Sequence, residues 1–262
     1  MTRSTTPRAA RQTATAPDQP AQPGPYPYRD YLRARRLLEA AIGRGTFYAL
    51  VTGASGAGKT SLKDDVSGVL DQHRQQLVYV SASAKATSGA LARFLARTFR
   101  VVPKRSYLET VTELMAALKI HTASVILWVD EADQLPHDTL SELRGLAESS
   151  GQARPAFSLV LSGLRELSTI LDAPDLFPLK RRLDVRCVLE GLRRDEVDGF
   201  LLHRFGSAGR ARLPELLHDE LFERTQAAPA LIHKVVTLAL DLAGDRGSVR
   251  EEHLRAALEA SL

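Results

Sequence analysis

The sequence is poor in cysteine and has no long apolar run. Cys187 is the only cysteine among the 262 residues, so no disulfide can form within the chain. Apolar stretches such as residues 125–129 are far shorter than the roughly 20 residues that cross a bilayer. The first 25 residues contain no apolar core of the kind found in secretory signals. These absences argue against a disulfide-stapled or membrane-bound protein, and we expect a cytoplasmic chain without a membrane partner.

Recognisable metal and base-reading motifs are also missing. The seven histidines and Cys187 show no metal-ligand spacing, and no zinc-finger or recognition-helix pattern occurs. A formal net charge of +4 is compatible with DNA as a partner, although charge this modest is common among proteins that bind none. The 44% of hydrophobic residues is ordinary for a packed globular protein.

Short apolar runs alternate with helical stretches through the first two thirds of the chain. Residues 1–27 are rich in Thr, Ala, Pro and Arg and are predicted to be a disordered, mildly basic tail. A helix is predicted over residues 28–42. The predicted strands are residues 47–52, 77–81, 124–130, 157–162 and 185–189. This order predicts an α/β domain over residues 28–191, with a parallel five-stranded sheet covered by helices on both faces.

Strand signals stop after Gly191. The remaining chain has helical periodicity and is predicted to form a small helical domain over residues 192–262. Its four predicted helices are residues 194–205, 214–226, 229–242 and 249–260.

A phosphate-binding motif of the P-loop type follows the first predicted strand. Residues 53–60, Gly-Ala-Ser-Gly-Ala-Gly-Lys-Thr, fit the pattern G-x-x-x-x-G-K-[ST] at every fixed position and precede a predicted helix. Backbone N–H groups and the helix terminus would surround the phosphates of ATP, while Lys59 adds charge and Thr60 binds Mg²⁺. The alternative is a glycine-rich turn that only connects a strand to a helix. That alternative does not explain why a lysine would be buried beside three glycines. The predicted ATP-binding residues are Gly53, Ala54, Ser55, Gly56, Ala57, Gly58, Lys59, Thr60 and Ser61.

Two carboxylates follow the third predicted strand. Asp130 would hold Mg²⁺ through water, and Glu131 would orient and deprotonate the attacking water. Acidic pairs after a strand are also common helix caps, but together with the P-loop they predict an ATPase that forms ADP and phosphate. Residues 130–133 also spell the helicase box Asp-Glu-Ala-Asp. A helicase needs a second recombinase-like domain, for which the chain after Gly191 is too short and too helical.

Taken together, these motifs resemble those of an AAA+ ATPase. The resemblance rests on the P-loop and Asp130-Glu131, and also on Leu-Ser-Gly at residues 161–163, Leu-Lys-Arg-Arg-Leu at 179–183 and the predicted helical lid. The resemblance implies that Ser162 senses the γ-phosphate. It also implies that Arg181 or Arg182 reaches the ATP of a neighbouring subunit in a homo-oligomeric ring or filament. The alternative for both arginines is an ordinary solvated surface position.

Residues 130–135, 162–167, 192–205 and 225–240 are similar to a compact bacterial AAA+ subgroup. It contains the bacteriophage Mu type target-capture ATPases, related transposon ATP-binding proteins and the secretion-pathway A ATPases. Secretion members carry a membrane span and a cell-wall-binding extension, which this sequence lacks. The resemblance therefore favours an ATP-dependent oligomer that binds DNA without sequence preference and recruits or activates a transposase.

Two other functions stay open. One is an AAA+ ATPase that remodels or energises a protein assembly, such as a secretion apparatus, without binding DNA. The other is a nucleotide-gated binding module with almost no turnover, against which Glu131 and Arg181 both argue. Adenine rather than guanine is inferred from the resemblance and from the lack of an Asn-Lys-x-Asp motif.

The lid departs from its relatives at one position. Many relatives have a phosphate-contacting arginine where this chain has Ala230, and His233 or Lys234 is a candidate substitute. If DNA is bound, the resemblance places backbone contacts at Lys85, Lys104 and Arg105, although solubilising surface charges explain them equally well. The tail residues Arg3, Arg8 and Arg11 would add weak nonspecific affinity.

Overall fold

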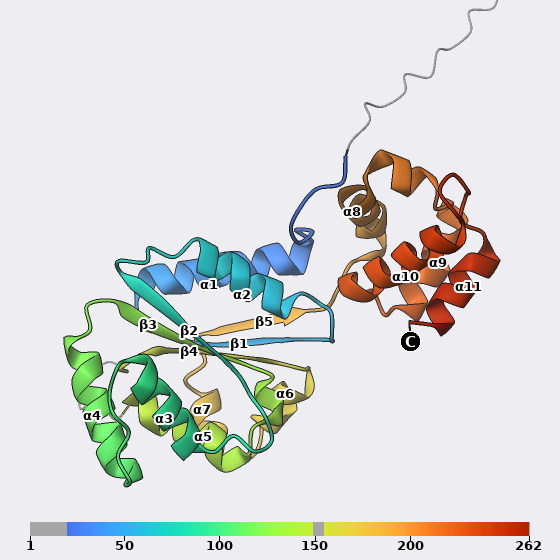
Figure 1. The fold of residues 1–262 in the computed structure, drawn as a ribbon. Coiled ribbons are helices and arrows are strands. Elements are labelled where there is room, and N and C mark those ends of the chain that lie inside the picture. The colour runs from blue at the N-terminus through green and yellow to red at the C-terminus, as the bar shows by residue number, and fades with distance from the viewer. Residues whose placement is uncertain (1–19, 149–154, 262) are drawn as a thin grey trace, which may run out of the picture.

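Five parallel strands form one sheet in the order β2-β3-β4-β1-β5 (Figure 1). The computed structural model describes residues 20–148 and 155–261. The strands are β1 (Tyr48–Gly53), β2 (Gln75–Ser81), β3 (Ser124–Asp130), β4 (Ser158–Gly163) and β5 (Val185–Leu189). Each lies within two residues of a strand predicted from the sequence, so the predicted α/β architecture is confirmed.

Burial explains why the strands differ in sequence pattern. Every residue of β1 and β4 is buried, as is every residue of β3 after its first. These central strands are covered on both faces, which accounts for their continuous apolar runs. In the edge strand β5, by contrast, Arg186 and Val188 are exposed and alternate with buried residues.

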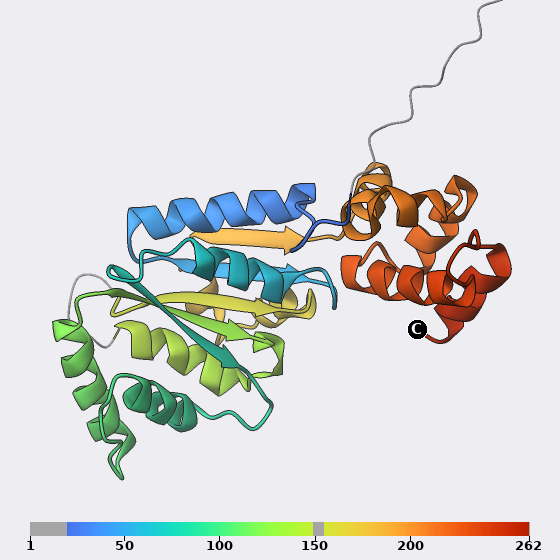
Figure 2. The same cartoon turned by 45° about the horizontal axis from the view of Figure 1, so that its top comes forward.

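Helices cover both faces of the sheet (Figures 1 and 2). On one face lie α1 (Arg29–Arg44) and α2 (Lys59–Gly68). On the other lie α3 (Ser88–Thr98), α4 (Tyr107–Ile120), α5 (His137–Glu148), α6 (Glu166–Ile170) and α7 (Phe177–Lys180). Two separate hydrophobic cores result, one on each face of the sheet.

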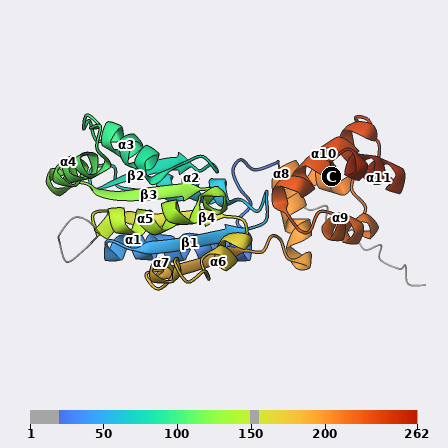
Figure 3. The ribbon, with the colours of Figure 1, turned by 90° about the horizontal axis from the view of Figure 1, so that it is seen from below.

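The C-terminal helices form a separate lobe beyond the carboxyl ends of β1 and β5 (Figures 1 and 3). This helical lid consists of α8 (Val197–Ala211), α9 (His218–Arg224), α10 (Pro229–Leu242) and α11 (Glu251–Glu259). Helix α8 bends at Gly206, where φ is 67° and ψ is −179°. Among the described residues, no helix combines the length and the apolar character needed to cross a bilayer.

The end of the predicted tail is bound to the lid. The ring of Tyr26 packs edge-on against Phe200 at 5.7 Å between centroids, and the Gln22 amide donates to the carbonyl oxygen of His203 at 2.7 Å. Tyr28 is only 2% exposed. We call residues 22–28 the N-terminal strap. Residues 22–27 belong to the predicted tail, but here they contact the lid, because the rings of the strap tyrosines have an apolar surface to cover. Arg3, Arg8 and Arg11 lie outside the described residues.

Gly191 connects the two lobes in a conformation that requires glycine. Its φ is +100°, and a Cβ atom at this position would lie 2.6 Å from the carbonyl oxygen of Ala227. The next residue, Leu192, donates its amide to the same oxygen at 2.9 Å. The chain can therefore leave the sheet and meet the lid only with no side chain at residue 191.

Substituting Gly191→Ala should destabilise the protein by about 1–3 kcal/mol, because the left-handed backbone and the contact with Ala227 both disfavour a side chain. Urea denaturation followed by circular dichroism measures this. Gly68→Ala is the matched control, since Gly68 is helical with nothing within 4 Å of its Cβ position. The control should be neutral or more stable by about 0.5–1 kcal/mol, and equal losses in both variants would contradict the assignment.

Candidate active site

The predicted P-loop links β1 to α2, as the sequence indicates. Gly56 and Gly58 both adopt positive φ, at 75° and 98°, so the chain can fold back sharply before α2 begins at Lys59. Gly53 lies tight against β5, because a Cβ atom there would be 2.6 Å from the carbonyl oxygen of Leu189. The loop therefore depends on its glycines to curve and to lie close to the sheet.

Lys59 is folded over this loop. Its ammonium group donates to the carbonyl oxygens of Gly53 at 2.9 Å and Ala54 at 3.0 Å. Burial lowers the pKa of Lys59, and the negative charge of Asp130 opposes that shift. A half-buried ammonium bonded only to neutral carbonyls gains strongly from an anion, so a phosphate is a better partner than those it has.

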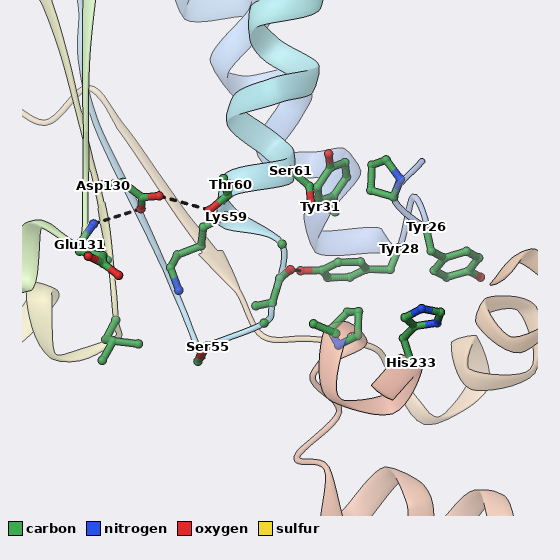
Figure 4. A pocket seen from close by; sticks show the side chains of 18 of the residues that line it. Tyr26, Tyr28, Tyr31, Ser55, Lys59, Thr60, Ser61, Asp130, Glu131 and His233 are labelled. Carbon is green, nitrogen blue, oxygen red and sulfur yellow. Dashed lines mark hydrogen bonds between the residues drawn. The ribbon is translucent and has the colours of Figure 1, made fainter. Parts of the chain in front are cut away.

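Asp130 is the most connected polar group of the site. The residue is 6% exposed, and its carboxylate accepts hydrogen bonds from Thr60 at 3.2 Å, Tyr79 at 3.2 Å and the Glu131 amide at 3.1 Å. Ser162 also donates to it. Figure 4 shows the bonds from Thr60 and from Glu131.

Thr60 and Asp130 fit a magnesium ion. Adjacent oxygen ligands of octahedral Mg²⁺ lie about 2.9 Å apart, since each Mg–O distance is about 2.0–2.1 Å. The Thr60 hydroxyl and the Asp130 carboxylate are 3.2 Å apart beside the P-loop, so both could hold one ion, Thr60 directly and Asp130 directly or through the water expected from the sequence. Phosphate oxygens and waters are the usual remaining ligands of Mg²⁺.

Ser162 lies at the end of β4 as expected, but it is turned away from the cavity. It is fully buried, donates to Asp130 and accepts a hydrogen bond from the Trp128 indole at 3.2 Å. The residues that line the cavity include Gly163 and Leu164 and not Ser162. In this arrangement Ser162 orients the Asp130 carboxylate, and its contact with a γ-phosphate stays a prediction.

Glu131 stands at the cavity wall in a strained conformation. Its φ of 53° is left-handed, and its side chain is exposed. The carboxylate accepts a hydrogen bond from Ser81, at the end of β2, at 3.3 Å. The Ser81 and Tyr79 contacts were missed in the sequence because both depend on pairing between β2 and β3. Strain at a carboxylate beside a P-loop is typical of a catalytic position.

A cavity of about 730 Å³ lies between the two lobes, within the range of small-molecule sites. One end is polar and is formed by the P-loop with Asp130 and Glu131. The other end is largely aromatic and is formed by the strap, α1 and the lid (Figure 4). The side chains at this second end include Tyr26, Tyr28, Tyr31, Phe200 and His233.

The tyrosines tie the aromatic end to the P-loop and α2. Tyr28 donates to the carbonyl oxygen of Ala57 at 2.7 Å, and Tyr31 donates to Asp65 at 2.8 Å. Burial raises the pKa of both phenols, so they stay neutral donors. The signal in the sequence is that three of the six tyrosines, Tyr26, Tyr28 and Tyr31, fall within six residues, but the surrounding prolines favoured a tail.

The lid touches the P-loop through a backbone contact. The Ala230 amide, at the start of α10, donates to the carbonyl oxygen of Gly56 at 3.1 Å. Of the two candidate substitutes for the missing arginine, His233 lines the cavity, whereas the Lys234 ammonium donates to the Ser261 carbonyl oxygen at 3.3 Å. Burial, and then the charge of Arg204, lower the pKa of His233, which favours its neutral form.

Arg181 and Arg182 do not line this cavity. They occupy the turn between α7 and β5, at the end of the sheet where β1 and β5 begin. The adjacent Asp184 amide donates to the carbonyl oxygen of Tyr48, the first residue of β1, at 2.9 Å. The P-loop follows the opposite end of β1, so neither arginine belongs to the site of its own subunit.

The three candidate DNA-binding residues are exposed but are not gathered at one place. Lys85 lies just before α3, and Lys104 and Arg105 lie just after it. The 11 residues of α3 span about 16 Å between them. Lys104 is also paired with Glu113 at 3.1 Å.

The comparisons with known proteins agree with this architecture. Residues 45–171 match the family model described as AAA domain, a range that includes the P-loop, Asp130, Glu131 and Ser162. Cdc6p from Pyrobaculum aerophilum superposes with a TM-score of 0.71 at 18% identity, covering 94% of this chain and 70% of that one. The ORC2 protein of Aeropyrum pernix gives 0.64 at 14% identity over 92% and 69%. The chain thus has the α/β fold of AAA+ P-loop proteins, followed by C-terminal helices.

One curated protein is related in sequence. The General secretion pathway protein A of Aeromonas hydrophila is 28% identical over 224 residues, which cover 82% of this chain. The chain spans only 40% of the length of that relative. The match therefore includes both lobes and leaves more than half of the relative uncovered.

Substituting Lys59→Ala should weaken ATP binding at least about 100-fold, because the cation facing the phosphates is lost from a half-buried position. Titration with a fluorescent ATP analogue measures this. Lys119→Ala, at the exposed end of α4, is the control and should bind as the wild type does. Tight binding by the Lys59 variant would refute the P-loop assignment.

Proposed function

We propose that the protein is a Mg²⁺-dependent ATPase that couples ATP hydrolysis to work on a protein assembly. The observation that supports this most is the joint placement of Lys59, Thr60, Asp130 and Glu131 around one cavity. A phosphate-binding loop, a metal-binding pair and an exposed carboxylate are the parts that phosphoryl transfer to water requires.

The polar end of the cavity accommodates the triphosphate. The P-loop amides and the start of α2 face the phosphates, and Lys59 exchanges its two carbonyl partners for phosphate oxygens. Thr60 and Asp130 would hold Mg²⁺, which would neutralise charge on the phosphates. Glu131 orients a water molecule and accepts its proton, and the hydrogen bond from Ser81 holds the carboxylate in reach of that water.

The aromatic end accommodates the base. Tyr26, Tyr28 and Phe200 offer apolar ring surface, and His233 offers a neutral ring that can hydrogen-bond. This surface suits a flat, uncharged purine, and the AAA+ fold makes adenine the base we propose.

Hydrolysis is proposed to depend on a second copy of the chain. Arg181 and Arg182 lie at the amino ends of β1 and β5, away from their own cavity. An arginine at that position can stabilise transition-state charge only in a neighbouring subunit. The active form in this proposal is therefore a homo-oligomer.

The choice of a protein assembly as the target follows the similarity to the General secretion pathway protein A. That name concerns secretion, and both lobes of this chain take part in the match. We propose that this chain likewise uses ATP to remodel or energise a secretion-type protein assembly.

A second candidate is regulation of DNA transposition together with a transposase. One feature favours it: residues 72–108 contain seven basic residues and no Asp or Glu. These are Arg74, Lys85, Arg93, Arg97, Arg100, Lys104 and Arg105. A stretch of chain with charges of one sign suits the phosphates of DNA.

DNA binding separates the two candidates. Fluorescence anisotropy on a random-sequence duplex would be measured with ATP, with ADP and without nucleotide over a range of salt concentrations. No binding in any state, even at low salt, is expected if the target is a protein assembly. Binding that requires ATP and weakens steeply with salt would instead favour the transposition function.

Substituting Glu131→Gln should lower ATP turnover about 100-fold or more while leaving ATP affinity near that of the wild type, because only the proton acceptor is lost. Phosphate release and nucleotide binding are measured on the same sample. Asp138→Asn, an exposed position at the start of α5, is the control and should keep full turnover. Unchanged hydrolysis in the Glu131 variant would remove Glu131 from this role.

A further inference from the structure

Helix α5 runs along the sheet, from the carboxyl ends of the strands to their amino ends. It begins shortly after Glu131 and Asp133, which line the cavity, and ends at Glu148 (Figure 3). Its 12 residues span about 18 Å. Asp133 anchors the starting end, because its carboxylate accepts the Leu164 amide at 2.8 Å.

The turn that carries the two arginines is fixed at several points. Lys180 is bonded to Asp172, and the Arg186 guanidinium donates to the carbonyl oxygen of Lys180 at 3.1 Å. Asp184 accepts the amide of Tyr48 at 2.9 Å. These contacts hold both ends of the turn and leave Arg181 and Arg182 between them.

Arg182 is engaged within its own subunit. Its Nε atom lies 3.1 Å from a carboxylate oxygen of Glu148, and Arg144 donates to the other oxygen at 2.9 Å. The Glu148 side chain is only 25% exposed. Burial and the charge of Glu148 raise the pKa of the adjoining Tyr48 to about 12, so its phenol adds no negative charge beside the carboxylate that the two arginines face.

Arg181 has a different environment. Its side chain is exposed, and no ion pair or side-chain hydrogen bond connects it to the described residues. Since Lys180, Arg182, Asp184 and Arg186 are all held, Arg181 is the charged side chain of this turn that is free to meet another molecule.

We propose that Glu148 is a positioning residue that holds Arg182 and thereby directs Arg181 at the ATP of the neighbouring subunit. Because α5 also begins beside Glu131, it transmits a change at one ATP site to the arginine offered to the next. This inference rests on the proposed oligomeric ATPase. It assigns the contact with the neighbour to Arg181 and an internal role to Arg182.

Mixed oligomers test it. Glu131→Gln subunits bind ATP and present Arg181 but do not hydrolyse, whereas Arg181→Ala subunits retain their own Glu131. Each variant alone should be nearly inactive. Equal mixing should raise phosphate release about tenfold above either variant alone, because the intact arginine now meets an intact site.

Glu148→Gln is then added to one component at a time. In the Glu131→Gln subunits, which supply the arginine, it should lower the recovered kcat about tenfold without changing KM, because a misplaced arginine stabilises the transition state poorly. In the Arg181→Ala subunits it should leave the recovery unchanged. Glu142→Gln, the same substitution at an exposed position of α5, is the matched control and should have no effect in either component.

The outcomes distinguish the two proposals. No recovery on mixing would overturn both the arginine acting between subunits and the role of Glu148. If mixing recovers phosphate release and Glu148→Gln does not lower it in either component, only the positioning role of Glu148 is overturned. Equal losses from placing Glu148→Gln in either component would show a general structural effect and would also overturn it.

Discussion

The rest of the site depends on a buried carboxylate at the end of β3. Asp130 is 6% exposed, and a charge so far from water is tolerated only if donors surround it. The donors come from α2, β2 and β4 through Thr60, Tyr79 and Ser162. These bonds hold the P-loop and three strand ends around one point, which is also where Mg²⁺ would lie.

The cavity depends equally on contacts that cross between the lobes. Tyr28 of the strap and Ala230 of the lid each bond to a P-loop carbonyl, at 2.7 Å and 3.1 Å. The loop that would hold the phosphates is thus held from two sides by donors, the Tyr28 hydroxyl and the Ala230 amide, that bond to its backbone carbonyl oxygens. Because Gly191 fixes how the chain leaves the sheet, loop, strap and lid form one connected nucleotide-sized site.

The parts of the site that follow from local pattern were predictable from the sequence. The P-loop residues and Asp130-Glu131 depend on short motifs beside strands, and both lie where the sequence places them. The strap was missed because proline-rich sequence hides the contact of Tyr26 with a lid helix some 170 residues away. The different environments of Arg181 and Arg182 depend on Glu148, a tertiary partner that no local pattern indicates.

Trp128 offers the most direct test of Asp130 as the centre of the site. It is the single tryptophan, is fully buried, and its indole donates to Ser162, which is bonded to Asp130. The measurement is tryptophan emission during titration with ATP, with Mg²⁺ and then with EDTA. We predict a saturable change that requires Mg²⁺, because an ion at Asp130 alters the bond between Ser162 and the indole. Emission that stays constant while Mg²⁺ and ATP saturate the protein would contradict this account.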